Sequence, residues 1–192
     1  MDSMRKQSSK HSEVAGNNLR QLTQRMHETA ETQPFAQDLI KGNLSKKKYA
    51  TYLFNQHPQY NMLEMLGMMH NLIDVRIAPK IHADYGELWE EFNPNQPPLL
   101  PIVKDYMDYL MSIQNDPDKL MAHIYVRHLG DLSGGQIISK KVPGSGTMYK
   151  FENVKELKDK IRSRCNDSMA DEANLCFDYA TKLFEQMSEL DI

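Results

Sequence analysis

Three glycines, Gly130, Gly134 and Gly135, fall within six residues of a segment that otherwise has the pattern of an amphipathic helix. Each glycine inside a helix costs about 1 kcal/mol relative to alanine, so this run should cost about 2–3 kcal/mol. Because residues four apart share a helix face, Gly130 and Gly134 leave one face without side chains. Either a flat ligand or a second backbone can lie directly against such a face, and the glycines alone fit both.

The composition fits a single globular domain. The chain has 192 residues, of which 40% are hydrophobic, and a formal net charge of -3, which gives no indication of nucleic-acid binding. It contains neither an apolar run of roughly 18–20 residues that could cross a bilayer nor the hydrophobic segment of a secretory signal. Cys165 and Cys176 lie eleven positions apart, which fits neither a disulfide framework nor a Cys-x-x-Cys pair. We therefore expect a soluble cytoplasmic monomer that does not bind membranes.

The spacing of the apolar residues predicts helices and no strands, so the expected fold class is all-α. Residues 1–16 are polar and show no periodicity, and we expect a disordered tail there, followed by one helical domain over residues 17–192. Four prolines mark residues 93–101 as a loop. The predicted helices cover about 18–33, 35–41, 45–74, 81–91, 102–113, 117–141, 153–166 and 169–190.

Several motifs match enzyme classes whose other parts are missing. Residues 132–136 read LSGGQ, which ABC-type ATPases use to contact nucleotide phosphate, but the chain has no Gly-x-x-x-x-Gly-Lys-Ser/Thr loop. None of the seven histidines has a glutamate three residues before it, which disfavours a carboxylate-bridged di-iron site. His123 and His128 point about 140° apart on a helix, so we expect no dedicated zinc site.

A polar stripe lies beside the apolar stripe of the first predicted helix. Arg20, Thr23, His27 and Glu31 recur at helical spacing, which places His27 at the edge of the core. The histidine could be an ordinary interfacial residue or a metal ligand. As a ligand it would have Glu31 one turn later to accept the proton on its other ring nitrogen. Arg20 could then pair with an anionic edge of the same ligand.

Basic residues concentrate between positions 140 and 164, where eight Lys/Arg stand against three Asp/Glu. Lys158 and Arg162 lie one helical turn apart on one face. They could form a solvated surface or clamp carboxylates. The local excess of positive charge favours an anionic partner.

The segment 125–136, YVRHLGDLSGGQ, closely resembles the distal-helix signature of haem oxygenases. Residues 27–31 are similar to the proximal-histidine segment of that family, and residues 161–166 with Phe177 match it in the expected order. The resemblance covers roughly residues 18–190. It implies a single-domain, haem-oxygenase-like helical fold with haem between the first helix and the glycine-bearing helix.

The resemblance also implies the contacts that haem b, both cofactor and substrate, would make. His27 would bind the iron, and the glycines would let the distal backbone approach the ring. The basic residues would face the haem propionates and turn the alpha position of the ring toward oxygen. The implied haem-binding residues are His27, Arg20, Glu31, Tyr125, Gly130, Gly134, Lys158, Arg162 and Phe177.

By the same resemblance, the reaction would consume O2 and external electrons and release biliverdin IX-alpha, carbon monoxide and ferrous iron. Asp131, with Arg127 and Tyr60, would order the distal water that donates protons. No flavin, nicotinamide or iron–sulfur motif is present, so electrons should come from a separate donor such as ferredoxin. A bilin reductase could act on the product.

Some positions differ from the common pattern of the family. Val126, His128 and Ala180 stand where threonine, tyrosine and asparagine are frequent, which affects the expected distal water structure. No hydrophobic tail follows Leu190. The chain therefore resembles the soluble bacterial, plastid-type or viral enzymes, and a viral enzyme would act in the host-cell cytoplasm.

Two other functional classes remain open at this point. A haem-binding or haem-storage protein would keep His27 without turnover. A thiaminase-like enzyme would use the same helical scaffold with a cysteine nucleophile, although neither Cys165 nor Cys176 lies in a recognisable nucleophile motif.

Overall fold

The computed structural model describes residues 15–89 and 95–192, and most of the expected tail over residues 1–16 lies outside these ranges. The all-α prediction is confirmed, because the described residues form helices and no strand. The α-helices are α1 (Ala15–Glu31), α2 (Pro34–Lys41), α3 (Lys46–Met69), α4 (Ala78–Trp89), α5 (Pro101–Ser112), α6 (Pro117–Ile138), α7 (Val154–Ser163) and α8 (Ala170–Glu189). Short 3-10 helices, η1 (Thr147–Tyr149) and η2 (Asp167–Met169), precede α7 and α8.

Local sequence signals account for several helix ends. The Ser45 hydroxyl and the Asp116 carboxylate accept hydrogen bonds from backbone amides at the starts of α3 and α6. Gly42 ends α2 in the left-handed conformation, with φ of 79°, which glycine adopts without steric cost. The predicted ends of the third and seventh helices were wrong, because α3 stops at Met69 and α7 at Ser163. After α7, the Asn166 side chain caps η2 instead of extending α7.

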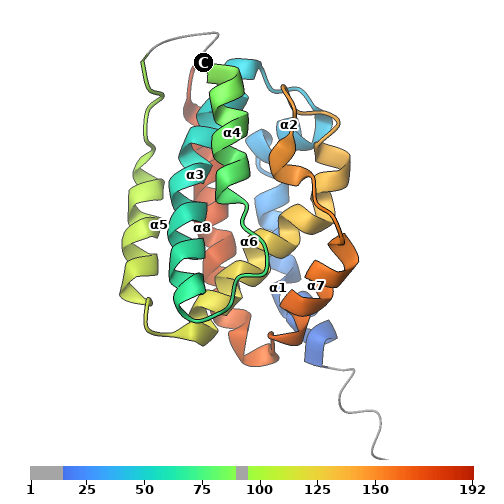
Figure 1. Ribbon diagram of the computed structural model, residues 1–192. Helices are drawn as coiled ribbons and strands as arrows, with labels where there is room; N and C mark the ends of the chain where they lie inside the picture. The colour runs from blue at the N-terminus through green and yellow to red at the C-terminus, as the bar shows by residue number, and fades with distance from the viewer. Residues whose placement is uncertain (1–14, 90–94) are drawn as a thin grey trace, which may run out of the picture.

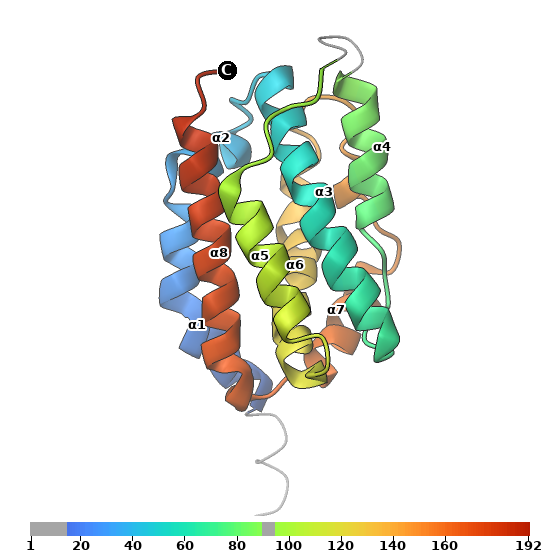
Figure 2. The same cartoon turned by 90° about the vertical axis from the view of Figure 1, so that its left-hand side faces the viewer.

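The helices pack in layers around α3, α6 and α8 (Figures 1 and 2). Helix α3 packs against α4, α5 and α6, and α8 packs against α1, α2, α5 and α6. One apolar cluster includes Phe35, Tyr49 and Leu183, and a second includes Leu63 and Ile124. Helix α6 therefore lies inside the bundle over much of its length. None of the helices in the described ranges is both long and apolar enough to span a bilayer.

Helix α3 is buried around most of its circumference and carries polar side chains into the core. Asn55 is fully buried, donates to the carbonyl oxygen of Pro98 at 3.0 Å, and accepts from the amide of Leu100 at 2.8 Å. This side chain fixes the segment that leads into α5. The other buried polar residues of α3 are Thr51, Gln56, Gln59 and Glu64.

Asp84 joins α4 to η1 and provides a test of this packing. The carboxylate is 2% exposed and accepts from the amides of Thr147 at 3.0 Å and Met148 at 2.8 Å. We expect Asp84→Ala to lower the free energy of unfolding by about 2–4 kcal/mol, because two buried amides lose their acceptor. Urea denaturation would measure this loss. Asp108→Ala, which removes an exposed partner of Lys104, should change stability by less than about 0.5 kcal/mol; equal losses in both variants would contradict the assigned role of Asp84.

Candidate functional site

The three glycines of α6 serve two different purposes. A Cβ atom added at Gly130 would meet no atom within 4 Å, and one at Gly134 would meet only Ile138 Cδ1 at 3.8 Å. A Cβ atom at Gly135 would lie 3.0 Å from Tyr149 Cβ and Cδ1. Gly135 therefore lets η1 pack closely, whereas Gly130 and Gly134 form an uncovered strip of main chain, called here the bare strip.

His27 lies on α1 with its side chain 43% exposed. Its Nε2 atom is 3.1 Å from Glu31 Oε1, one turn later, as the spacing predicts. The ring also meets Phe177 of α8 edge-on, with centroids 5.5 Å apart. The histidine is thus held in place by Glu31 and Phe177, while its Nδ1 atom makes no hydrogen bond within the described residues and can bind a metal ion.

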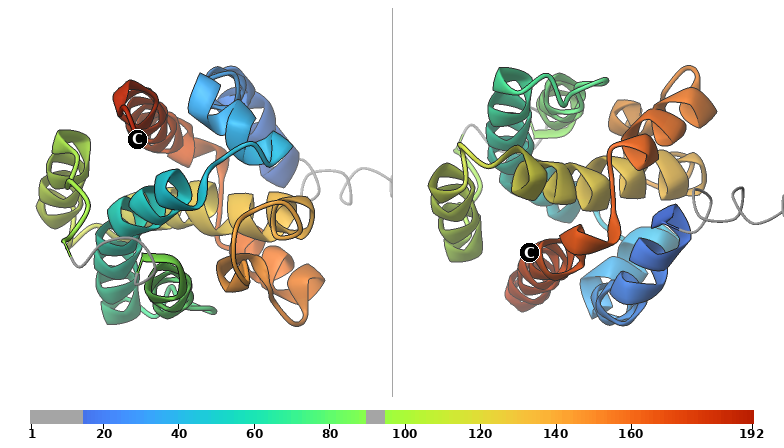
Figure 3. Two further views of the ribbon diagram at one scale, coloured as in Figure 1. Left: turned by 90° about the horizontal axis from the view of Figure 1, so that it is seen from above. Right: turned by 90° about the horizontal axis from the view of Figure 1, so that it is seen from below.

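Helix α8 connects α1 with α6. It contacts α1 through Phe177 and α6 through Glu172, whose Oε1 atom accepts from His123 Nε2 at 2.9 Å. His123 and Gly130 lie on one side of α6, two turns apart. The end-on views show α1 and α8 side by side on the same side of α6 (Figure 3). The side of α6 that α8 covers at His123 is therefore open at Gly130.

Asp131 and Tyr60 are brought together beside the bare strip. The Tyr60 hydroxyl, on α3, donates a hydrogen bond to Asp131 Oδ2. Burial raises the pKa of Asp131 to about 6, and the hydrogen bond from Tyr60 and the charge of Arg127 only partly offset this. A carboxyl group with such a pKa can both hold and release a proton near neutral pH.

Arg127 is buried between α6 and α3 and makes no direct hydrogen bond to Asp131. Its Nη1 and Nη2 atoms donate to Gln56 at 3.2 Å and Gln59 at 2.8 Å. The guanidinium lies 4.8 Å above the Tyr106 ring and 5.9 Å from the Tyr60 ring. Its two Nη groups therefore point toward α3 and not toward the bare strip.

Two of the predicted basic residues, Arg20 and Arg162, lie near Tyr125 of α6. Burial raises the pKa of this half-buried tyrosine, while Thr23, Arg162 and Arg20 lie close enough to oppose the shift. Lys158 is half-buried one turn before Arg162 and makes no ion pair within the described residues. Arg162 has only a long contact, 3.9 Å, to Asp159. The positive charges of Arg20 on α1 and Arg162 on α7 thus lie near α6 with few acidic groups close by.

These features suit a flat, anionic metal complex. The bare strip accepts a flat surface, the imidazole of His27 offers a nitrogen ligand, and the cations around Tyr125 suit carboxylates. Ile137, one turn beyond Gly134 on the same face, is 62% exposed and adds apolar surface. The residues present therefore fit haem, the group that the family resemblance implies.

A buried cluster between α5, α6 and α8 was not predicted from the sequence. His123 bonds to Tyr106 at 2.7 Å and to Glu172, and Cys176 lies 3.6 Å from the Tyr106 hydroxyl. Burial alone would raise the pKa of Cys176, but the neighbouring His123 lowers it to about 7. The thiol is fully buried. Most residues of this cluster are far apart in sequence. The only sequence signal is the spacing of four between Glu172 and Cys176, which places these two residues on one helix face.

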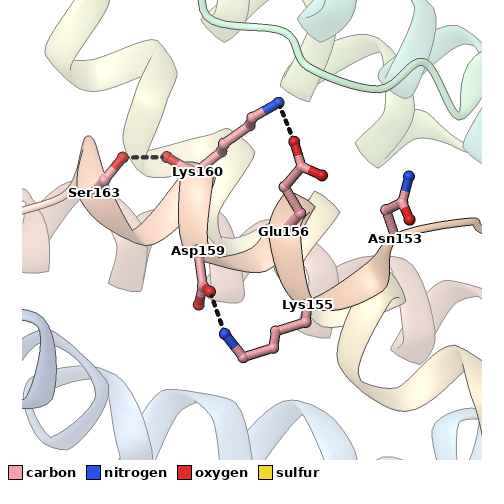
Figure 4. Close-up of a pocket in the computed structure, with 6 residues that line it drawn as sticks. All are labelled: Asn153, Lys155, Glu156, Asp159, Lys160 and Ser163. Atoms are coloured by element: carbon pink, nitrogen blue, oxygen red, sulfur yellow. Dashed lines mark hydrogen bonds and ion pairs between the residues drawn. The ribbon is translucent and has the colours of Figure 1, made fainter.

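The outer face of α7 carries a shallow depression that contains none of the predicted site residues (Figure 4). Lys155 pairs with Asp159 and Lys160 pairs with Glu156, each at 2.9 Å. These exposed pairs neutralise one another, so this surface is a solvated helix face. The lining residues are Asn153, Lys155, Glu156, Asp159, Lys160 and Ser163.

Comparisons with known proteins agree on one family. The family model described as "Heme oxygenase" matches residues 14–186. "Heme oxygenase 2" of Macaca fascicularis is 31% identical over 208 residues, which cover 89% of this chain and 64% of that protein. The chain thus spans less than two thirds of the length of this relative.

Two solved structures share the fold. The "Structure of Heme Oxygenase from Leptospira interrogans" matches with a TM-score of 0.78 and 26% identity, over 91% of this chain and 98% of that one. Heme oxygenase-1 from Synechocystis sp. PCC6803, solved in complex with heme, matches with a TM-score of 0.74 and 24% identity. That match covers 88% of this chain and 90% of the other. At this identity it is a likeness of fold.

A methyl group on the bare strip should separate folding from haem binding. We expect Gly130→Ala to raise the stability of the haem-free protein by about 0.5–1 kcal/mol, since alanine favours helix and meets no neighbour. Haem affinity should fall by roughly tenfold, because the added methyl holds a flat ligand off the main chain. Urea denaturation and optical haem titration would measure the two effects.

Gly86→Ala in α4 is the matched control for this variant, because a Cβ atom there also meets nothing within 4 Å. It should give the same gain in stability with unchanged haem affinity. If Gly130→Ala binds haem with unchanged affinity, the bare strip is not part of the haem site.

The raised pKa of Asp131 predicts a pH-dependent difference in stability between the wild type and Asp131→Asn. Because the folded-state pKa, about 6, lies above the unfolded value of about 3.9, the carboxyl group favours folding at low pH and loses this contribution as the pH rises through 6. The wild type should therefore lose on the order of 1–2 kcal/mol relative to the variant between pH 4.5 and 7.5. Urea denaturation of both haem-free proteins would detect this, and parallel pH profiles would contradict the burial of Asp131.

Proposed function

The chain belongs to the haem oxygenase family, and we propose that it opens the haem ring oxidatively. The reaction consumes O2 and external electrons and releases biliverdin, carbon monoxide and ferrous iron. The observation that carries this proposal is the bare strip beside the Asp131–Tyr60 pair, on a helix that α8 joins to the helix of His27.

On the iron-binding side, His27 would be the protein ligand. Glu31 accepts a hydrogen bond from Nε2 of the ring, which leaves Nδ1 free to bind the iron. Phe177 packs against the edge of the imidazole and limits its rotation. The contacts of both residues support a fixed orientation of the ligand.

On the opposite side, Gly130 and Gly134 bring the main chain of α6 against the ring plane. Arg20, Lys158 and Arg162 would pair with the two carboxylates and orient the ring, and Arg20 and Arg162 lie near Tyr125. We assign the alpha regiochemistry to this orientation. Bound haem supplies the iron that activates oxygen and the ring that is opened.

Asp131 and Tyr60 order distal water and move protons there. Their hydrogen bond and the pKa of Asp131, which burial raises to about 6, support this role. Arg127 acts indirectly, because Gln56 and Gln59 hold its guanidinium away from the bare strip. No cationic donor from this residue then reaches the ligand side of α6, and water delivers the protons.

The electrons come from a separate acidic protein, for which a ferredoxin-type donor is our choice. Lys158, which makes no ion pair within the described residues, and Arg162, which has only the long contact to Asp159, support docking beside the site. The outer face of α7 is instead neutralised by its own ion pairs. An enzyme that reduces linear tetrapyrroles would consume the product.

The two alternatives differ from this proposal in observable ways. A storage protein would bind haem and keep it intact under reducing conditions. A thiaminase-like reaction needs a thiol that the substrate can reach, but Cys176 lies on the inner face of α8 and is fully buried.

Haem titration followed by turnover tests the proposed function. We expect one haem per chain and, in air with ferredoxin, its reductase, NADPH and catalase, loss of the haem bands with formation of biliverdin and carbon monoxide. Asp131→Ala should still bind haem while its biliverdin yield falls by a factor on the order of 100, because its proton-transfer group is gone. Asp108→Ala, an exposed carboxylate on α5, is the control and should behave as the wild type.

A haem spectrum that stays intact, with ascorbate as an alternative reductant, would identify a binding protein. Absence of haem binding would return the thiaminase-like class to consideration.

A further inference from the structure

A buried carboxylate determines which nitrogen of His128 carries a proton. Glu64 of α3 has no exposed side-chain surface and accepts from His128 Nε2 at 3.1 Å, from the amides of Ile77 and Ala78, and from Arg76 Nε at 3.3 Å. Burial alone would raise the pKa of Glu64, but the hydrogen bonds from His128 and the Ile77 amide lower it overall. The carboxylate is therefore ionised and can only accept, so Nε2 of His128 is the donor.

This arrangement leaves His128 with an unsatisfied acceptor. With Nε2 protonated, Nδ1 of the neutral ring carries a lone pair. The side chain is 1% exposed, and Nδ1 has no hydrogen-bond partner within the described residues. A buried polar atom of this kind is normally satisfied by an ordered water molecule, since leaving it unpaired costs about 1–3 kcal/mol.

His128 belongs to the same buried group as the proposed distal residues. Its ring lies 5.7 Å from the Tyr60 ring, and Tyr60 donates to Asp131. Asp131 follows His128 by three residues, so the two side chains are neighbours on the surface of α6. Arg127, the remaining charged neighbour, also has an unpaired buried atom, Nε. An unpaired donor and an unpaired acceptor thus flank Tyr60.

We propose that His128 is a positioning residue of the distal site: its Nδ1 accepts a hydrogen bond from an internal water molecule held in the Tyr60–Asp131 cluster, and Glu64 fixes the tautomer that makes this possible. This proposal rests on the proposed function. A tyrosine here would also donate to Glu64 but would lack the ring-nitrogen acceptor. A water molecule that donates to Nδ1 becomes a stronger acceptor for its next neighbour, so His128 makes the distal water easier to deprotonate.

Nitrogen NMR of the haem-free wild type tests the geometry directly. In long-range 1H–15N spectra, His128 should show a protonated Nε2 and an unprotonated Nδ1 whose 15N resonance is shifted because the nitrogen accepts a hydrogen bond. The exposed His82 in α4 serves as the internal reference. A protonated Nδ1, or a bare Nδ1 without that shift, would overturn the proposal whether or not the protein turns haem over.

Substitution tests the consequence for the site. His128→Tyr keeps a donor for Glu64 and removes the ring nitrogen that accepts at the Nδ1 position, so haem should still bind one to one. The midpoint of the optical pH titration of the ferric haem complex should rise by roughly 0.4–1 pH unit, as expected for the loss of one hydrogen bond. His82→Tyr should leave the midpoint unchanged.

Equal midpoints in wild type and His128→Tyr would refute the positioning role, and a wild type that binds no haem would refute the proposed function instead. If His128→Tyr does not fold, the NMR measurement on the wild type still decides the proposal.

Discussion

Helix α6 has to remain uncovered on one side while it is held firmly on the others. A strip without side chains contributes no packing of its own, and its glycines weaken the helix by about 2 kcal/mol. The position of α6 must therefore come from its remaining faces. Gly135 allows close contact with Tyr149, and Arg127, His123 and His128 each reach a partner on a neighbouring helix.

Buried polar contacts carry much of this positioning, which makes them sensitive to change. Inside a protein a satisfied hydrogen bond is strengthened by the low dielectric, while an unpaired partner is costly. Glu64 of α3 accepts from three groups at the start of α4 and from one on α6, so it ties these three segments together. Such directional contacts specify one arrangement of the helices more narrowly than apolar packing does.

The helical architecture could be predicted because local physics determines it. Ser45 and Asp116 cap helices, and prolines and Gly42 end or begin them, without reference to distant parts of the chain. Glu31 lies beside His27 because one helix carries both residues at a spacing of four. The family signature also indicated Asp131 and the two open glycines.

The pairings across helices could not be predicted from the sequence. Gln56 and Gln59 look like ordinary polar residues of α3, and nothing in their spacing indicates that they hold Arg127. The partnership of Glu64 with His128 joins residues 64 positions apart. Such contacts depend on the relative rotation and depth of two packed helices, which the apolar pattern of each helix constrains only loosely.

Gly134 and Gly135 are chemically identical neighbours, yet different atoms constrain them. An alanine at position 135 would crowd Tyr149 at 3.0 Å, whereas one at position 134 would meet a single methyl group of Ile138 at an ordinary distance. In a library selected only for correct folding, position 134 should accept small residues while position 135 stays glycine. Selection for ligand binding should restrict the residues accepted at position 134 as well. The set of residues accepted at each position would then show whether that position contacts the protein interior or the ligand.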